Sequence, residues 1–574
     1  MSRHCHQLTG DTVRPVHNTR NAETAEVSAP DGAEGRGRAG RRRARRAGWL
    51  AAATVGVVAL FLLYWRQARV ASVSSDAASI VLQGSDMLHG NLLLHGWFTA
   101  DVSFYSTELV QYMLLQTVLP MSPGLVFVAG AMTYTILVAL AGWLAKGRAT
   151  GREGILRACI GAGVMLAPAL GDFTGSLLHA PDHLGSAVPV LVAWLVIDRC
   201  PPRWWVPAIA CVLLACGEVA DPLIEITGAA AIAVACGARG CHQVLRRRRR
   251  DGDGPGAPLW FEPSLAVAAV VSVGLARLAM AAIRAAGGFT AAPVTGGFMG
   301  VAGIWRHAAV TGKGLLGLFG AAFWTENPQE HVPGWQVLFS CVHLAGVVLV
   351  IAGFALAVRR FFRADSLLTA GLAAGIVLNV AAFMTSRFPT DLLSIREASA
   401  VLPLSAALAG RLIPGYLTGA PLRRLRPVPV LATVGAAYAA MLGVNVFTAR
   451  PVAPSYQNVA VWLSGHHLTS GLAAGYWLSN VVTVDAGDKV RVRNVQVTRG
   501  TVSQPGPWEI DTRWYDPSAS TANFLLTDAG PGSGLWRAQL RAAERTFGRP
   551  ARTYRFDGFT VFTWHGNVLS RLQL

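Results

Sequence analysis

Long apolar segments alternate with short polar segments from residue 48 to residue 447 of the chain. The first apolar run, 48 to 65, approaches the ~20 residues that a helix needs to cross the hydrocarbon core of a bilayer. Comparable runs follow along the chain, and together they predict about eleven transmembrane helices. The further runs lie near 122–145, 154–171, 184–198, 204–219, 222–239, 262–283, 335–357, 366–384, 398–414 and 428–447.

Composition agrees with a membrane protein. Of the 574 residues 52% are hydrophobic and 14% are charged, against ~25% charged residues in an ordinary soluble protein. Soluble dehydrogenases and nuclear factors are therefore excluded. The formal net charge of +18 would by itself suggest a nucleic-acid partner, but most arginines form short runs between apolar segments, as expected for positive-inside anchoring. No nucleic-acid partner is predicted.

The arginine runs also set the predicted orientation. Residues 1–47 are polar and rich in Gly, Ala and Arg, which predicts a disordered cytoplasmic tail. An odd number of spans then places the C-terminus outside a multi-pass cell membrane protein. The arginine-rich loops fall on the inner side in this scheme: 41–46, 148–152, 199–203, 246–250, 359–363 and 423–426.

Two apolar segments, 107–120 and 314–324, are too short to span the bilayer and are interpreted as interfacial or re-entrant helices in outer loops. The first external loop, 66–121, is long for a simple connection. The domain organisation predicted is thus a tail 1–47, a transmembrane domain 48–447 and an extracytoplasmic domain 448–574.

The last segment leaves the membrane pattern and predicts a small α/β domain. Its predicted strands are Asn480–Val484, Lys489–Val497 and Asn523–Thr527, its helix is Leu535–Phe547, and a hairpin joins Arg552–Phe556 to Phe559–Trp564 around Asp557-Gly558. None of the eight cysteines falls in this domain, so a disulfide framework is excluded there. No Cys/His spacing resembles a zinc site, and no metal ligand is assigned.

Acidic residues gather in the first external loop. Loops longer than ~12–15 residues are usually functional or disordered, and the aromatic residues of this loop argue against disorder. The alternative is that these acids are ordinary solvated loop residues. The acids of interest are Asp76, Asp86, Asp101 and Glu108.

Other outer polar residues lie at predicted helix ends. Asp182 and His183 precede one span, and a capping role for Asp182 is the alternative to a functional one. Asp221 before Pro222 also suits an N-cap. Glu225 lies one turn further on, and an ionisable residue inside a span is by default a functional-site candidate.

Six outer cations oppose the orientation rule, among them Arg66 and Arg69. The other four suit a lipid phosphate, because guanidinium groups bind phosphate bidentately. An ion pair of Arg396 with Asp391 or Glu397 is the alternative explanation for that residue. The four cations are Arg306, Lys313, Arg387 and Arg396.

Three short elements resemble those of the C-type glycosyltransferase (GT-C) superfamily. Ser75-Asp76-Ala77-Ala78, followed by a helix from Gln83 to Asn91, is similar to the acidic motif that opens the first external loop in this family. Arg396 to Pro403 resembles its arginine-to-proline element, and Gly475-Tyr476-Trp477 resembles an aromatic element of membrane mannosyltransferases.

The resemblance implies an all-α polytopic GT-C-like fold and an inverting glycosyltransferase. Such an enzyme takes a sugar from a polyprenyl-phosphate carrier in the bilayer and passes it to a cell-envelope glycan or glycoprotein on the outer face. Asp76 would be the catalytic base and the outer cations would bind the phosphate, so we expect Asp76 within about 10 Å of an outer Arg or Lys. Ala77 stands where a second acid is common, which leaves the use of a divalent metal open.

Two alternatives remain. The protein could be a GT-C-like envelope scaffold without activity. It could also be a transporter or flippase, for which Glu225, His343 and Asn379 are the polar residues inside spans. Abundant Arg with only three lysines suggests a GC-rich, actinobacteria-like source.

Overall fold

The computed structural model describes most of the chain, in two compact units, Met1–Gly56 and Val57–Leu574. The first helix, α1 (Gly32–Ala68), begins well before the predicted start of the first span, because Ala and Arg are both good helix formers. The predicted disordered tail lies, for residues 1–31, outside the described residues. These are 32–179, 183–248, 258–293, 297–299, 303–324, 334–361, 366–417, 427–498 and 500–572.

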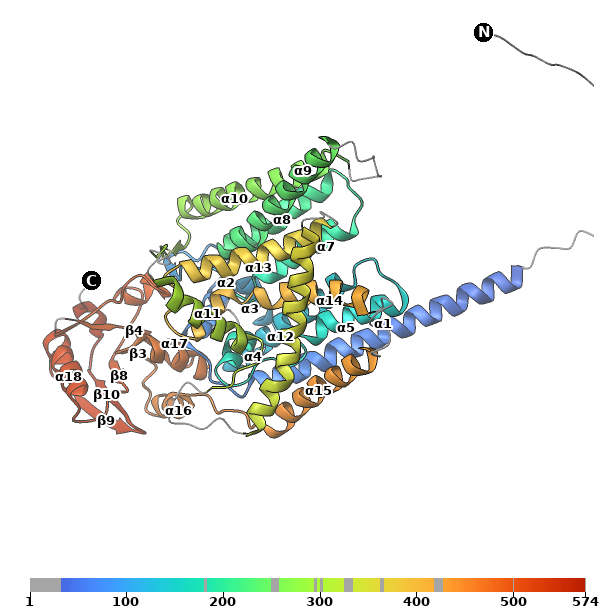
Figure 1. The fold of residues 1–574 in the computed structure, drawn as a ribbon. Coiled ribbons are helices and arrows are strands. Elements are labelled where there is room, and N and C mark those ends of the chain that lie inside the picture. Colours follow the sequence, from blue (N-terminus) through green and yellow to red (C-terminus); the bar gives the residue numbers. More distant parts are fainter. Residues whose placement is uncertain are drawn as a thin grey trace, which may run out of the picture. The chain divides into compact units, whose positions relative to one another are not determined.

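The described part of the chain is mostly helical, and six of its helices are long and apolar enough to cross a membrane. The protein is therefore a multi-pass membrane protein, as its apolar runs predict. One of the six is the segment Leu50–Ala68 of α1. The other five are α4 (Pro123–Lys146), α10 (Phe261–Ala285), α12 (Gly334–Phe361), α13 (Leu367–Thr385) and α15 (Pro427–Thr448) (Figure 1).

The other predicted spans also coincide with helices, but these helices fall short of that length or apolarity. α14 packs against α4, α5 and α12. At the crossing of α5 and α14, a Cβ on Gly410 would lie 2.6 Å from the backbone nitrogen of Gly161, so only glycine permits this close approach. The helices of this group are α5 (Gly151–Gly163), α7 (Ala187–Arg199), α8 (Trp205–Ala220), a π-helix η1 (Glu225–Ala230) leading into α9 (Ala231–Arg248), and α14 (Val401–Leu417).

The first external loop is folded. It contains α2 (Ser75–Leu88), β1 (Trp97–Thr99) and α3 (Glu108–Leu115), and their apolar side chains form a buried core. Ser74 caps α2 by accepting a hydrogen bond from the Ala77 backbone at 3.2 Å. α3 is shorter than a membrane span, as predicted for 107–120. The predicted helix 314–324 is misplaced, because α11 (Ile304–Leu318) begins ten residues earlier and ends at Leu318.

The C-terminal part carries a five-stranded sheet in the order β4-β3-β8-β10-β9. The predicted strand near 524–527, the helix near 535–547 and the hairpin are all confirmed. Asp557 and Gly558 both have positive φ, as a two-residue hairpin turn requires. The elements are β3 (Ser470–Ala473), β4 (Arg491–Asn494), β8 (Phe524–Thr527), α18 (Gly534–Phe547), β9 (Arg552–Phe556) and β10 (Phe559–Thr563).

The predicted strand Asn480–Val484 is wrong, because these residues belong to the helix α17 (Tyr476–Asp485). Val481, Val482 and Val484 are all buried, since α17 packs on the sheet and on α2. A short continuous apolar run does not distinguish a buried strand from a buried helix. The predicted strand Lys489–Val497 is divided between β4 and β5 (Gln496–Thr498), which pairs with β6 (Thr501–Ser503).

A second sheet joins three distant parts of the chain. In it β1 pairs in parallel with β2 (Thr290–Ala291) and antiparallel with β7 (Ile510–Asp511). The first external loop is thereby fixed to the C-terminal part, and Glu509 is held directly before β7. The remaining short helices are α6 (Phe173–Leu178), η3 (Leu393–Ala398), α16 (Gln457–Gly465), η5 (Thr512–Tyr515) and η6 (Val568–Arg571).

Candidate functional site

Asp76 lies in the first turn of α2, with about a quarter of its side chain exposed. The hydroxyl of Tyr476, the first residue of α17, donates a hydrogen bond of 2.6 Å to Asp76 Oδ1. The neighbouring Ser75 hydroxyl donates to the Tyr476 carbonyl oxygen at 2.7 Å. Two of the elements that resemble the GT-C family, near residues 76 and 476, are therefore in direct contact.

Arg396 of η3 approaches the other oxygen of the same carboxylate. Its Nη1 lies 3.8 Å from Asp76 Oδ2, well inside the distance expected from the sequence. Its Nε also lies 3.9 Å from Glu397 Oε1, so the alternative ion pair exists together with the contact to Asp76. Asp391 instead accepts from the Ser394 backbone at 2.8 Å.

Glu509 lies beyond Tyr476 and is hydrogen-bonded to the same hydroxyl. Burial, followed by the nearby charge of Asp76, raises the pKa of Glu509 well above its usual value. A tyrosine hydroxyl carries one proton, so it cannot donate to both carboxyl groups. The consistent arrangement has a protonated Glu509 donating to the Tyr476 hydroxyl, which in turn donates to Asp76 Oδ1.

His183 forms a second cluster, which Glu397 links to Arg396. Its Nδ1 lies 2.9 Å from Asp221 and its Nε2 lies 2.7 Å from Glu397. Burial lowers the pKa of His183, but the two carboxylates outweigh it and raise this pKa well above the usual value. The imidazole is therefore a cation held between two anions, and Glu397 connects it to Arg396.

Asp101 and Glu108 lie within the electrostatic range of this cluster. Burial and then the charge of Glu397 raise the pKa of Asp101. Glu108 is almost fully buried, and burial raises its pKa to about 7 despite a hydrogen bond from Thr107. Glu108 Oε1 has no hydrogen-bond partner among the described residues. Burial thus favours the neutral form of both acids.

The raised pKa of Glu108 predicts that the difference in folding stability between wild type and Glu108→Gln depends on pH. Below pH 4.5 the folded and unfolded states are both protonated at this residue; between 4.5 and about 7 only the unfolded state ionises, so stability falls. Glu108→Gln mimics the neutral form and should gain on the order of 1–3 kcal/mol over wild type as pH rises, levelling above about 7. Thermal unfolding in detergent at pH 5 and pH 8 measures the gain. A difference that does not change with pH contradicts the assignment.

The other predicted site residues lie elsewhere or outside the described part. Asp86 pairs with Arg513 at 2.7 Å, and Glu225 pairs with Arg277 at 2.7 Å. Asp221 does accept from the Leu223 backbone, at 2.9 Å, as an N-cap would, in addition to holding His183. Asp182 lies outside the described residues. Of the four predicted phosphate-binding cations, Arg396 is the one with a contact to Asp76 among the described residues. The other three are exposed: Arg306, Lys313 and Arg387.

Sequence reasoning missed Glu509 and assigned Glu397 only as a partner of Arg396. Glu509 is a single acid in a loop before β7, and no motif marks it; its burial and its positive φ of 48° appear only in the folded chain. Tyr476 was marked in the sequence by the aromatic element Gly475-Tyr476-Trp477, although no role was assigned to it there. Within the described residues, no group of three or more His, Cys, Asp or Glu side chains is arranged to hold a metal ion.

No protein-family model and no curated protein matches the chain. Among solved structures, it is similar to the oligosaccharyltransferase AglB of Archaeoglobus fulgidus in complex with an inhibitory peptide and a dolichol-phosphate. That alignment has 12% identity and a TM-score of 0.41, and it covers 89% of this chain and 74% of the other. A second structure, an oligosaccharyltransferase of the same organism with Zn and sulfate, aligns with 12% identity and a TM-score of 0.44, covering 86% and 69%.

Proposed function

We propose that this protein is a membrane glycosyltransferase that moves a sugar from a polyprenyl-phosphate carrier to a cell-envelope glycan or glycoprotein on the outer face. The observation that carries the proposal is the 3.8 Å approach of Arg396 to Asp76, on short elements outside the six long apolar helices. A carboxylate next to a guanidinium supplies both a base and a site for a phosphate. Transfer from a lipid phosphate needs these two groups side by side.

The reaction is a displacement at the anomeric carbon with inversion. The acceptor hydroxyl gives its proton to Asp76 as its oxygen bonds to the anomeric carbon, and the bond from that carbon to the phosphate oxygen breaks. General-base catalysis of this kind increases the rate about 10²–10⁴-fold over the same reaction without a base. The polyprenyl phosphate leaves with the bonding electrons, and Arg396 stabilises the negative charge that develops on it.

The surrounding residues act as positioning residues. Tyr476 occupies Oδ1 of Asp76, so Oδ2 faces Arg396 and the substrates. A neutral Glu509 supports the tyrosine without placing a second anion beside the base. The cation of His183 holds Glu397, and Glu397 in turn holds Arg396, so the guanidinium keeps its orientation when the phosphate departs.

The proposed topology has eleven spans with the N-terminus in the cytoplasm. The residues 1–47 are then a cytoplasmic tail, 48–447 the transmembrane domain and 448–574 an extracytoplasmic domain. Support comes from the arginine-rich loops, which all fall on one side in this arrangement. The actinobacteria-like composition is consistent with a polyprenyl carrier and an envelope acceptor.

Cysteine labelling in intact cells tests this topology. In a background without exposed native cysteines, Leu92→Cys and Ser518→Cys are expected to react with a membrane-impermeant maleimide, because both positions are exposed and proposed to be outside. Arg203→Cys, exposed in a proposed inner loop, is the matched control and should react only after the cells are opened. Labelling of positions 92 and 518 only in opened cells would reject an outward site.

A further inference from the structure

A cavity of about 800 Å³ lies between the C-terminal half of α2 and the edge of the five-stranded sheet. Asp76 does not line it. Asp76 and Asp86 are ten positions apart on α2, or about 15 Å at ~1.5 Å per residue. The cavity is therefore distinct from the candidate catalytic site but joined to it by one rigid helix.

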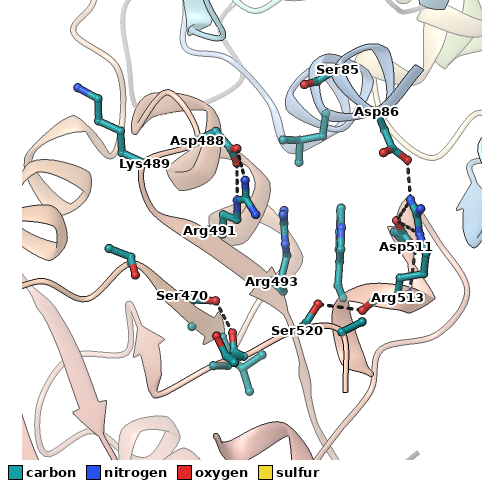
Figure 2. Close-up of a pocket in the computed structure, with 18 of the residues that line it drawn as sticks. Ser85, Asp86, Ser470, Asp488, Lys489, Arg491, Arg493, Asp511, Arg513 and Ser520 are labelled. Atoms are coloured by element: carbon teal, nitrogen blue, oxygen red, sulfur yellow. Dashed lines mark hydrogen bonds and ion pairs between the residues drawn. The ribbon is translucent and has the colours of Figure 1, made fainter. Parts of the chain in front are cut away.

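Most of the charges in this cavity compensate one another. Arg513 contacts both Asp511 and Asp86, and Arg491 pairs with Asp488 at 2.7 Å. Figure 2 shows Arg493 between these two groups, with its guanidinium pointing toward the face of α2 that carries Ser85 and Asp86. The three acids that line the cavity are thus engaged by other arginines.

Among the described residues, Arg493 makes no direct ion pair with a carboxylate. Its guanidinium stacks on Trp514 at 3.8 Å, and its Nη1 is buried with no hydrogen-bond partner among the described residues. Burial lowers the pKa of Arg493 to about 10, so the charge is retained at neutral pH but is poorly solvated. Lys489 also lines the cavity, is exposed and has no ion pair within the described part of the chain. The charges of Asp488 and Asp511 act on the pKa of Arg493 in the opposite direction but do not outweigh burial. A guanidinium whose Nη1 is buried and unpaired is costly, and a bound anion would offset that cost.

The rest of the lining suits a sugar. Hydroxyl groups come from Ser85, Thr469 and Ser520, and the aromatic side chain of Trp97 forms part of the wall. Hydroxyls and aromatic faces are the groups that bind the polar edges and apolar faces of pyranose rings. Two cations without carboxylate partners in a cavity of this composition point to a sugar that carries a negative charge.

From these contacts we infer that the cavity binds an anionic sugar unit of the acceptor glycan, bearing a carboxylate or a phosphate, with Arg493 and Lys489 as its charge partners. The acceptor role rests on the proposed function, whereas binding of the anionic sugar does not. An extended acceptor chain would place this unit about 15 Å from the hydroxyl that Asp76 deprotonates, along the length of α2.

Calorimetric titration of the full-length protein in detergent tests the inference without requiring transfer. The probes are D-glucuronate, D-glucose 6-phosphate and neutral D-glucose. Saturable binding is expected for at least one anionic sugar, with at least tenfold weaker binding of glucose. The tighter of the two anionic probes identifies the charged group. Equal affinity for glucose and for both anionic sugars overturns the inference.

Three variants separate this site from general charge effects. Arg493→Gln should weaken binding of the anionic sugar about tenfold or more, and Lys489→Gln, at an exposed position, about threefold. Arg541→Gln removes the same charge from an exposed position on α18 and should leave affinity unchanged. A lower thermal unfolding temperature of Arg493→Gln would mean that its weaker binding could come from lost stability. In that case the affinity of Lys489→Gln for the anionic sugar is the deciding measurement. If Lys489→Gln and Arg541→Gln bind the anionic sugar with equal affinity, the assignment is contradicted. If the protein binds the anionic sugar but shows no transferase activity, only the proposed function is rejected.

Discussion

Replacing Asp76 by asparagine is expected to lower sugar transfer by about 10²–10⁴, the contribution of a general base, while leaving the folded protein as stable as wild type. The amide oxygen can still accept the hydrogen bond from Tyr476, so the local structure is kept. An amide cannot take the proton of the acceptor hydroxyl. The measurement is transfer from a labelled polyprenyl-phosphate sugar in membranes that contain equal amounts of each variant.

The matched control is Asp172→Asn. Asp172 is exposed before α6 and makes no side-chain capping hydrogen bond, so this variant removes the same charge and should transfer sugar at the wild-type rate. If Asp76→Asn and Asp172→Asn are equally active, Asp76 is not the base. A wild-type protein that transfers no sugar from any polyprenyl-phosphate donor would instead favour the scaffold alternative.

The apolar runs were sufficient to place the six long apolar helices of the described residues, because a bilayer imposes length and composition on each span. The strand and helix elements near the C-terminus followed from alternation and turn residues. The prediction failed at Asn480–Val484, where α17 lies between the sheet and α2 and is buried on several sides. Every residue from Leu478 to Val484 is buried, Ser479, Asn480 and Thr483 included, so the one-sided apolar pattern of a surface helix is missing.

The candidate site was only partly accessible to sequence reasoning. The motif around Asp76 marked the acid, but its contact with Tyr476 joins residues separated by 400 positions. Sequence patterns describe local structure and contain no information on such a pairing. Glu509 could not have been found, since its role depends on burial beside the tyrosine and no local feature distinguishes it from a surface acid.

The small sheet of β2, β1 and β7 explains how these distant residues meet. Its register pairs Trp97 with Asp511 and Phe98 with Ile510, which fixes the segment before β7 against the first external loop. Gly96, with φ of +84°, allows this approach, because a Cβ there would lie 2.6 Å from an Asp511 oxygen. Trp97 and Asp511 of the same pairing also line the cavity beside α2, so the two sites share a structural support.

Neutralising Arg396 should lower the rate of sugar transfer about 10²–10³-fold. This is the usual effect of removing one donor that stabilises a developing negative charge. Arg396→Lys keeps the charge but loses the planar guanidinium that binds phosphate bidentately, so it is expected to recover only part of the activity of wild type and more than Arg396→Gln. The loss should appear mainly in kcat if the guanidinium acts on the leaving phosphate. Steady-state kinetics with the polyprenyl-phosphate sugar as the varied substrate measure this division between kcat and KM.

A structural role for Arg396 would give a different pattern. Its contacts with Asp76 and Glu397 could stabilise the fold, so thermal unfolding of each variant is measured beside activity. Arg284→Gln removes an exposed cation at the end of α10 and should leave both kcat and stability unchanged. Charge stabilisation in the transition state lowers the barrier without requiring any change in folding stability. The guanidinium therefore does not act on the phosphate if Arg396→Gln loses no more activity than Arg284→Gln. The same conclusion holds if a lower unfolding temperature alone explains the lost activity.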